Sequence, residues 1–232
     1  MIIKGFQATT LLDYPGQIAS IIFTPGCDFR CPYCYNKSLV MNSPNLIELD
    51  ENKIIEKISK RKNLIDGVVL SGGEPTLQKD LPKFASKIKE LGLKVKLDTN
   101  GTRPDMLQEL INKKLVDFIA MDIKGPLEKY EQITQTKLDL GAIKKSVELL
   151  MKAGVDYEFR TTALPDLLTE KDFQKIGEWL KGAKKYCIQQ FKPMPDMIDS
   201  SYEHKETYTS KELEKIRKQL EPFFEKVEVR AD

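Results

Sequence analysis

The sequence contains few of the residues that build common metal sites, and it lacks a strong net charge and any long apolar run. Of 232 residues, one is histidine (His204) and four are cysteine. Lysine plus arginine total 37 and aspartate plus glutamate 35, so the net charge of +2 indicates no nucleic-acid partner. No apolar stretch approaches the ~20 residues that cross a bilayer, which argues against a membrane protein. The opening Met-Ile-Ile-Lys-Gly has no signal-peptide pattern.

The cysteines are concentrated in one place. Cys27, Cys31 and Cys34 lie in a single short segment, unlike the spaced cysteines of a secreted disulfide framework. We therefore predict that the protein is cytoplasmic.

These three cysteines have the spacing C-x3-C-x2-C and follow a strand-like segment at 18–24. Four thiolates complete the shell of a zinc ion or of a [4Fe–4S] cube, whereas three leave one iron open to a substrate or cofactor. A structural zinc site remains an alternative. Its fourth ligand would have to be Cys187 or His204, both far downstream.

Strand-like and helix-like segments alternate along the whole chain, which predicts an α/β fold with parallel strands and right-handed crossovers. We expect strands at 18–24, 67–71, 95–98, 118–122, 157–161 and 186–191, with a last edge strand at 227–230. Amphipathic helices are expected at 50–61, 79–91, 104–114, 141–153, 170–182 and 210–224, the last capped by Ser210. Six units are too few for an eight-fold barrel. No linker or repeat is visible, so we expect a single domain over 1–232.

Polar residues follow the ends of successive predicted strands. They are the three cysteines, the Ser71-Gly-Gly-Glu-Pro75 turn, Asp98-Thr-Asn100, Asp122-Ile-Lys124 and, late in the fifth strand, Arg160. Active sites of parallel α/β barrels collect at the carboxyl ends of the strands. We therefore expect these side chains to share one mouth.

Five motifs resemble those of the radical S-adenosylmethionine (SAM) enzymes, in the expected order. They are the cysteine loop 24–36, the Gly-Gly-Glu-Pro turn in 67–76, and the segments 96–101, 120–124 and 5–16. Segments 96–101 and 120–124 look like those of activating enzymes for glycyl-radical enzymes. Segment 5–16 resembles the corresponding segment of the branch that activates anaerobic ribonucleotide reductase. The resemblance implies an incomplete six-fold (β/α)6 barrel that binds a [4Fe–4S] cluster and SAM.

The resemblance also implies roles for the cysteine loop and the glycine turn. Cys27, Cys31 and Cys34 would hold three irons, and the methionyl amino and carboxylate groups of SAM would occupy the fourth. Gly72, Gly73 and Glu74 would lie against the SAM amino group, because glycines allow a close backbone approach.

Two residues of this set have structural alternatives. Tyr33 would contact the adenine, or it would be an aromatic side chain that shields the cluster. Glu74 would instead be only a capping group at the end of its strand.

A third group of residues follows later strands. By the same resemblance, Asp98, Thr99 and Asp122 would bind a monovalent cation beside the SAM carboxylate, and oxygen ligands suit a hard cation. Lys124 would contact that carboxylate through a charge-assisted bond, and Arg160 would do the same or orient the substrate. The alternatives are that the aspartates cap the following helices and that Arg160 forms a structural ion pair.

The sequence departs from the activating enzymes at two places. Tyr35 stands where they often carry histidine, and segment 188–193 lacks their Pro-Tyr-His pattern. We expect Cys187 to be a buried, inert thiol. The long irregular segment 192–209 is the candidate for a partner-facing loop, with the contacts to cluster and cofactor expected elsewhere. The alternative is a mobile surface connection.

The leading functional hypothesis is therefore an enzyme that cleaves SAM reductively to a 5′-deoxyadenosyl radical. That radical would abstract hydrogen from a glycine of a partner glycyl-radical enzyme, namely anaerobic ribonucleotide reductase, with flavodoxin or ferredoxin as electron donor. One alternative is a small-molecule radical SAM enzyme of the 7-carboxy-7-deazaguanine synthase type. Another is a non-catalytic iron–sulfur or zinc protein.

Overall fold

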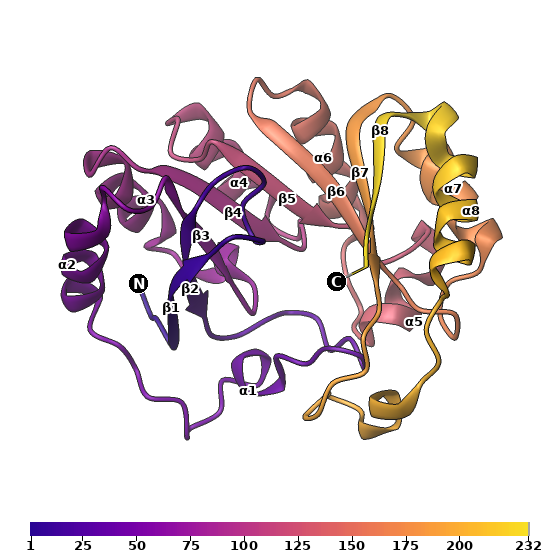
Figure 1. Ribbon diagram of the computed structural model, residues 1–232, viewed down its shortest axis with the longest axis horizontal. Helices are drawn as coiled ribbons and strands as arrows, with labels where there is room; N and C mark the ends of the chain where they lie inside the picture. The colour runs from indigo at the N-terminus through magenta and orange to yellow at the C-terminus, as the bar shows by residue number, and fades with distance from the viewer. Residues whose placement is uncertain (232) are drawn as a thin grey trace.

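The computed structural model describes residues 1–231 and is built around one eight-stranded sheet in the order β1-β2-β3-β4-β5-β6-β7-β8. Seven of the strands are parallel: β2 Ala19–Thr24, β3 Gly67–Gly72, β4 Lys94–Thr99, β5 Phe118–Asp122, β6 Asp156–Ala163, β7 Ala183–Gln190 and β8 Phe224–Arg230. Strand β1 (Gly5–Thr10) pairs antiparallel with β2. The sheet curves into an open arch whose two edges do not meet (Figure 1).

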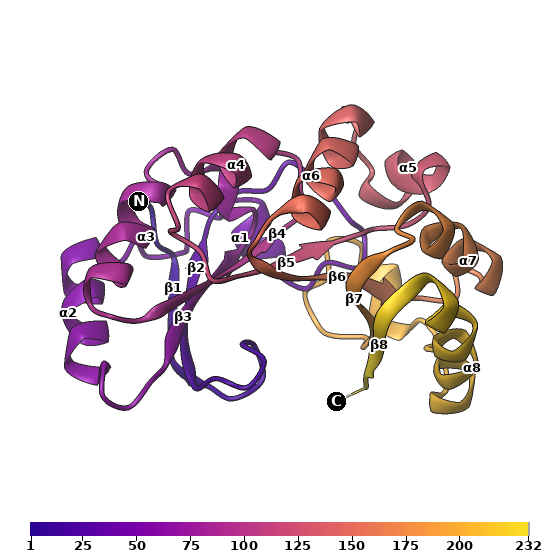
Figure 2. The same ribbon diagram turned by 90° about the horizontal axis from the view of Figure 1, so that it is seen from above.

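One main helix follows each of the strands β2 to β7. These helices are α2 Glu51–Arg61, α3 Leu81–Glu90, α4 Pro104–Asn112, α6 Leu140–Lys152, α7 Glu170–Trp179 and α8 Ser210–Leu220. They cover the outer face of the arch, as Figure 2 shows. Two shorter α-helices, α1 Lys37–Val40 and α5 Tyr130–Thr134, and four 3₁₀ turns, Pro75–Leu77, Leu127–Lys129, Ser200–His204 and Glu221–Phe223, lie in the connections. The predicted incomplete (β/α)6 barrel is confirmed, with β8 as a seventh parallel strand.

Two local predictions differ from the structure. Strand β1 was not expected, because its side chains Gln7, Ala8 and Thr9 are exposed and give no apolar alternation to detect. Helix α8 is capped by Thr209 rather than by Ser210. Thr209 and Glu212 form a reciprocal capping box, which satisfies two backbone N–H groups at this helix start.

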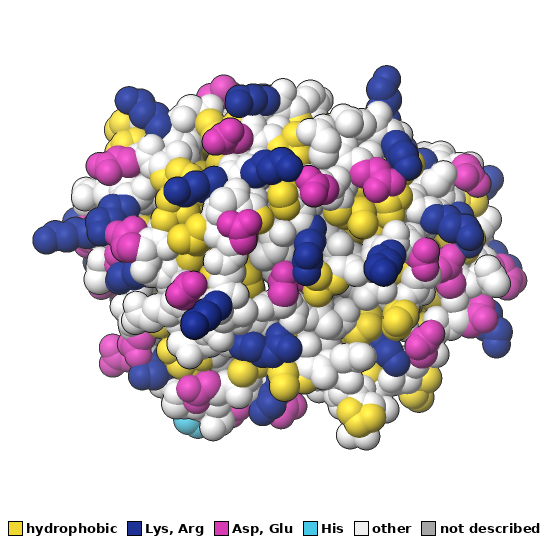
Figure 3. Space-filling model, turned by 180° about the vertical axis from the view of Figure 1, so that it is seen from behind, with side chains coloured by type: hydrophobic (Ala, Val, Ile, Leu, Met, Phe, Trp, Pro, Cys, Tyr) yellow, Lys and Arg dark blue, Asp and Glu magenta, His cyan; other side chains and the backbone are white. Residues whose placement is uncertain are grey.

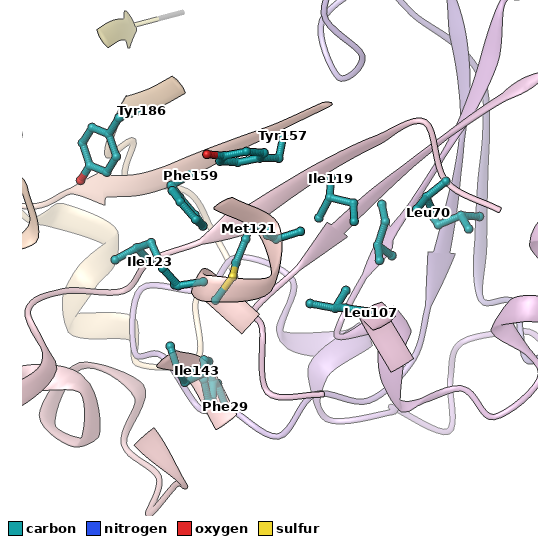
Figure 4. Close-up of a cluster of buried hydrophobic side chains, with 14 of the residues drawn as sticks. Phe29, Leu70, Leu107, Ile119, Met121, Ile123, Ile143, Tyr157, Phe159 and Tyr186 are labelled. Atoms are coloured by element: carbon teal, nitrogen blue, oxygen red, sulfur yellow. The ribbon is translucent and has the colours of Figure 1, made fainter. Parts of the chain in front are cut away.

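The two faces of the sheet have different chemistry, because successive side chains of a strand point to opposite sides. The outer face and the helices form the main apolar core, where Leu70, Met121 and Phe159 pack with Leu107 of α4 and Ile143 of α6 (Figure 4). The inner face carries charged residues on alternate positions of β4, β5 and β6, namely Lys96, Asp98, Asp122, Glu158 and Arg160. The same strands therefore supply both the core and a polar lining.

The connection between β1 and β2 closes the bottom of the barrel. Tyr14 is buried and packs with Ile21, Val69 and Phe118 on the inner face, near the amino ends of the strands. A Cβ atom on Gly67, the first residue of β3, would lie only 3.0 Å from the Tyr14 ring. Within the segment Leu12–Gly16, the Tyr14 ring thus fills the inner face near the amino ends of the strands, whereas Leu12 is exposed.

The surface agrees with the balanced composition. On the face shown in Figure 3, positive and negative side chains are interspersed, with no field of one sign. None of the helices within residues 1–231 is long and apolar enough to cross a lipid bilayer.

Candidate active site

The cysteine loop runs from the carboxyl end of β2 toward α1 and carries three free thiols. Burial raises the pKa of Cys27 to about 12 and of Cys31 to about 11, and it also raises the pKa of Cys34. The Lys124 charge opposes this effect at all three sulfurs, so Lys124 lies close to the whole loop. Without iron the thiols are therefore protonated, and metal binding has to release their protons.

The turn after β3 lies directly against the start of the cysteine loop. The Gly73 N–H donates to the Thr24 carbonyl oxygen at 2.9 Å, and the Glu74 N–H donates to that of Gly26 at 2.7 Å. A Cβ on Gly73 would stand 1.9 Å from the Gly26 oxygen, and one on Gly72 would stand 2.4 Å from the Thr24 backbone. Gly72 also has a φ of +122°, which side-chain-bearing residues rarely adopt. Both glycines are therefore required for the loop and the turn to meet.

Glu74 connects this turn to the end of β4. Its carboxylate is buried and accepts hydrogen bonds from the Thr99 hydroxyl at 2.8 Å and from the Asn100 N–H at 2.6 Å. It also accepts from the backbone and hydroxyl of Thr76, so it caps the 3₁₀ turn Pro75–Leu77. Burial raises the pKa of Glu74 to about 7 against these bonds. The capping alternative is thus realised, and a contact to the SAM amino group stays a prediction.

Asn100 is a site residue to which the sequence analysis gave no role. Its side-chain amide donates to Asp28 Oδ1 at 2.7 Å and lies 3.8 Å from Cys27 Sγ. Its backbone N–H binds Glu74. One residue therefore joins the cysteine loop to the buried carboxylate. In the sequence, only its position next to Asp98 and Thr99 indicated that Asn100 belongs to the site.

The charged residues at the ends of β4, β5 and β6 form one ion-pair network. Arg160 Nε lies 2.9 Å from Asp122 Oδ1, and its Nη1 lies 3.5 Å from Asp98 Oδ1. Lys124 Nζ lies 3.1 Å from Asp122 Oδ2, and Lys96 pairs with Asp98. Burial alone would raise the pKa of Asp122, but Arg160 and Lys124 outweigh it and lower that pKa to about 2.

The structure bears on two structural alternatives left open by the sequence: helix capping by the two aspartates and an ion pair formed by Arg160. Neither aspartate caps a helix, because the N-cap of α4 is Arg103 and that of the 3₁₀ turn after β5 is Pro126. The ion-pair role of Arg160 is present in the structure. Lys96 was missed because a lysine inside a strand normally indicates a solvent-facing position.

Segment 192–209 lies against the cysteine loop, contrary to prediction. The Ile198 N–H donates to the Cys34 carbonyl oxygen at 3.1 Å, and the Asp199 N–H donates to that of Pro32 at 3.0 Å. The expectation that this segment stays clear of the cluster site is therefore wrong. Its tip, residues 192–196, is exposed throughout, whereas Met197 is buried and the rest of the segment alternates between exposed and partly buried positions.

The aromatic residues beside the last cysteine have different surroundings. Tyr33 is buried, and its ring packs edge-on against Phe191, with ring centroids 6.4 Å apart. Tyr35 is 61% exposed. His204, by contrast, is an exposed residue at the end of a 3₁₀ turn. A contact between Tyr33 and adenine remains a prediction.

The three thiols are the donor set that three irons of a cube require. Zinc needs every ligand sulfur about 2.3 Å from one point. Within residues 1–231, no three His, Cys, Asp or Glu side chains come close enough to hold a single ion. A cube provides a separate iron for each sulfur and does not require such convergence. Cys187 is fully buried in β7, where burial raises its pKa to about 11, as expected for an inert thiol.

Replacing Cys27, Cys31 or Cys34 by Ala should abolish a SAM-responsive cluster, whereas Cys187→Ala should retain it. Each loop cysteine contributes one thiolate to a set of three, and losing one removes a strong bond and its charge. Iron and sulfide content, together with the EPR spectrum after reconstitution, measures the result. A cluster lost only in Cys187→Ala would contradict the assignment.

Glu74→Gln should flatten the pH dependence of stability of the metal-free protein. Folding raises the Glu74 pKa from 4.5 to about 7. Its stabilising contribution is therefore full below pH 4.5 and is lost as the pH rises through 7, a difference of roughly 3 kcal/mol. Urea unfolding between pH 4.5 and 8 compares the slopes of the two proteins. Parallel curves would show that this carboxyl does not titrate as the buried group described.

Comparison with known proteins identifies the family. The sequence profile of the Radical SAM superfamily matches residues 21–180. The chain is 34% identical to a Methanocaldococcus jannaschii protein named "Putative glycyl-radical enzyme activating enzyme", over 99% of this chain and 96% of that one. It is 28% identical to the pyruvate formate-lyase-activating enzyme of Clostridium pasteurianum, over 97% of both chains.

A solved structure shares the fold. SuiB of Streptococcus suis, bound to S-adenosylmethionine, aligns with a TM-score of 0.68 and 12% identity over 91% of this chain and 52% of its own. The profile match, the relatives and the three-thiol loop agree on one cofactor pair, a [4Fe–4S] cluster and SAM. The chain belongs to the radical SAM superfamily of enzymes.

Proposed function

We propose that this protein is a glycyl-radical-enzyme activating enzyme whose partner is anaerobic ribonucleotide reductase. Residues 1–232 would act as a single domain in the cytoplasm, with flavodoxin or ferredoxin as the electron donor. When bound, the reduced cluster and SAM supply a 5′-deoxyadenosyl radical that abstracts hydrogen. The substrate would be one backbone glycine of the partner.

The accessibility of the inner face is the main observation in favour of a protein substrate. None of the six main helices covers this face, because they lie outside the arch (Figure 2). The Asp122 side chain is 30% exposed although it belongs to the ion-pair network. A loop of another protein can therefore approach the strand ends, whereas a small molecule would need a closed pocket with converging polar groups.

The relatives support the same class of reaction. Two of them carry the name of activating enzymes and align over nearly their whole length. The choice of ribonucleotide reductase as partner is supported by the resemblance of segment 5–16.

Three groups of residues would have separate roles in this reaction. The three cysteines hold the cluster, and the backbone turn at Gly72 and Gly73 braces their loop. Lys124 keeps a positive charge at the mouth, because Asp122 holds its pKa well above the usual value despite burial. That charge is available for the SAM carboxylate.

The activation assay tests the proposal directly. The reconstituted protein is mixed anaerobically with SAM, dithionite or reduced flavodoxin, and the large subunit of an anaerobic ribonucleotide reductase. We expect a glycyl-radical EPR doublet and stoichiometric 5′-deoxyadenosine. A partner whose radical-bearing glycine is replaced by alanine, and Cys34→Ala in this chain, are the controls.

A different result would redirect the assignment. Turnover of a pterin precursor of 7-carboxy-7-deazaguanine, with no radical on the partner, would establish the small-molecule alternative. SAM cleavage without a radical on either substrate would reject both assignments.

The exposed tip of segment 192–209 should recognise the partner. Met194→Lys should lower glycyl-radical formation several-fold and leave slow uncoupled SAM cleavage unchanged, because the backbone bonds of Ile198 and Asp199 to the cysteine loop are kept. Leu64→Lys, an exposed apolar position before β3 at the opposite end of the barrel, is the matched control. Equal effects of the two variants, or a parallel fall in SAM cleavage, would exclude a partner-facing tip.

A further inference from the structure

The residues predicted to bind a monovalent cation already have protein partners. Arg160 reaches both aspartates: its Nη1 lies 3.5 Å from Asp98 Oδ1, and its Nη2 lies 2.9 Å from Asp122 Oδ1. Lys96 binds Asp98, and Lys124 lies 3.1 Å from the second oxygen of Asp122. Each carboxylate is thus contacted by two cationic side chains.

The third predicted ligand is engaged as well. The Thr99 hydroxyl donates to Glu74 Oε1 at 2.8 Å and accepts from the Gly101 N–H at 3.1 Å. It points into the bond network that joins β4 to the glycine turn, so it is not presented as a free ligand beside the two aspartates.

The charge balance of the ion-pair network opposes the binding of a further cation. Three cationic side chains, Lys96, Arg160 and Lys124, contact two carboxylates, and their exposed fractions are only 1%, 12% and 15%. The neighbouring Glu158 is neutralised by its own partners, Arg230 and Lys185. A poorly hydrated ion-pair network with one excess positive charge repels an added cation and attracts an anion. The chemistry of these residues therefore does not fit a bound alkali metal ion.

The sheet places these groups by register. Lys96 and Asp98 are two residues apart on β4, so they share the inner face, and Asp122 is the direct cross-strand partner of Arg160 on β6. The planar guanidinium offers five fixed donors and can bridge carboxylates from two neighbouring strands. Lys96 supplies a second positive charge, as an ammonium group in contact with Asp98.

We propose that Lys96 and Arg160 take the place of a monovalent cation in this protein, so that its SAM site works without Na⁺ or K⁺. The excess positive charge that an alkali ion would provide for a carboxylate ligand is built into the chain. This inference concerns the SAM site of a radical SAM enzyme and holds whichever molecule donates the hydrogen atom.

Binding measurements on the wild type provide the first test. SAM is titrated into the reconstituted protein, followed by its effect on the cluster EPR spectrum, in KCl, NaCl or tetramethylammonium chloride at equal ionic strength. We expect dissociation constants equal within twofold in the three salts. The metal-free protein should show the same thermal midpoint in all three and no excess ²³Na relaxation. A tenfold or greater gain in SAM affinity on adding K⁺ or Na⁺ overturns the proposal.

A matched pair of variants provides the second test. Lys96→Met removes the ammonium group but keeps an unbranched apolar side chain. The ion-pair network then loses its excess positive charge, and Asp98 loses one of its two cationic partners. SAM affinity and thermal midpoint should then rise with K⁺. Lys185→Met is the control, because Lys185 is also a lysine of the inner face, 18% exposed, but pairs with Glu158 and Glu228.

The two variants give opposite expectations. A Lys96→Met protein that responds to K⁺ no more than Lys185→Met overturns the proposal. If Lys96→Met fails to fold, Lys96→Gln takes its place, and the salt comparison on the wild type still decides.

Discussion

The turn after β3 reaches the cysteine loop only because two of its residues have no Cβ atom. Methyl groups at Gly72 and Gly73 would overlap the backbones of Thr24 and Gly26. This close approach allows two backbone hydrogen bonds to fix the loop at the end of β2. The buried Glu74 then ties the same turn to β4. Three strand ends are thereby held in one arrangement before any cofactor binds.

The second constraint is the alternation of side chains along the strands. Inner-face charges are flanked in sequence by residues of the apolar core, as Asp122 is by Met121 and Ile123 and Lys96 is by Val95 and Leu97. The core therefore fixes the strands, and the strands fix the ion-pair network. A buried network of this kind is stable only when every charge has a partner. The glycine turn and the network together define a mouth with thiols on one side and excess positive charge on the other.

Much of this arrangement follows from the sequence, and the exceptions have physical reasons. Helical spacing and short apolar runs predict the six units, and the cysteine spacing predicts the loop. Strand β1 escapes detection because it is an exposed edge. Lys96 and Asn100 escape because their importance comes from neighbours distant in the chain, Arg160 and Cys27. Segment 192–209 was misplaced since backbone hydrogen bonds, which any sequence can make, bring it to the cysteine loop.

An arch that does not close leaves two strands with an unpaired side. Such edges present free N–H and C=O groups on which another strand can add, which is a route to aggregation. Strand β8 carries four charged residues among seven, Glu225, Lys226, Glu228 and Arg230, and β1 is short with an exposed polar centre. Arg230 also binds the buried Glu158, at 2.8 Å and 2.6 Å, and so anchors this edge to the sheet. The charges of β8 thus hold this edge to the sheet and also keep it from pairing with a second molecule.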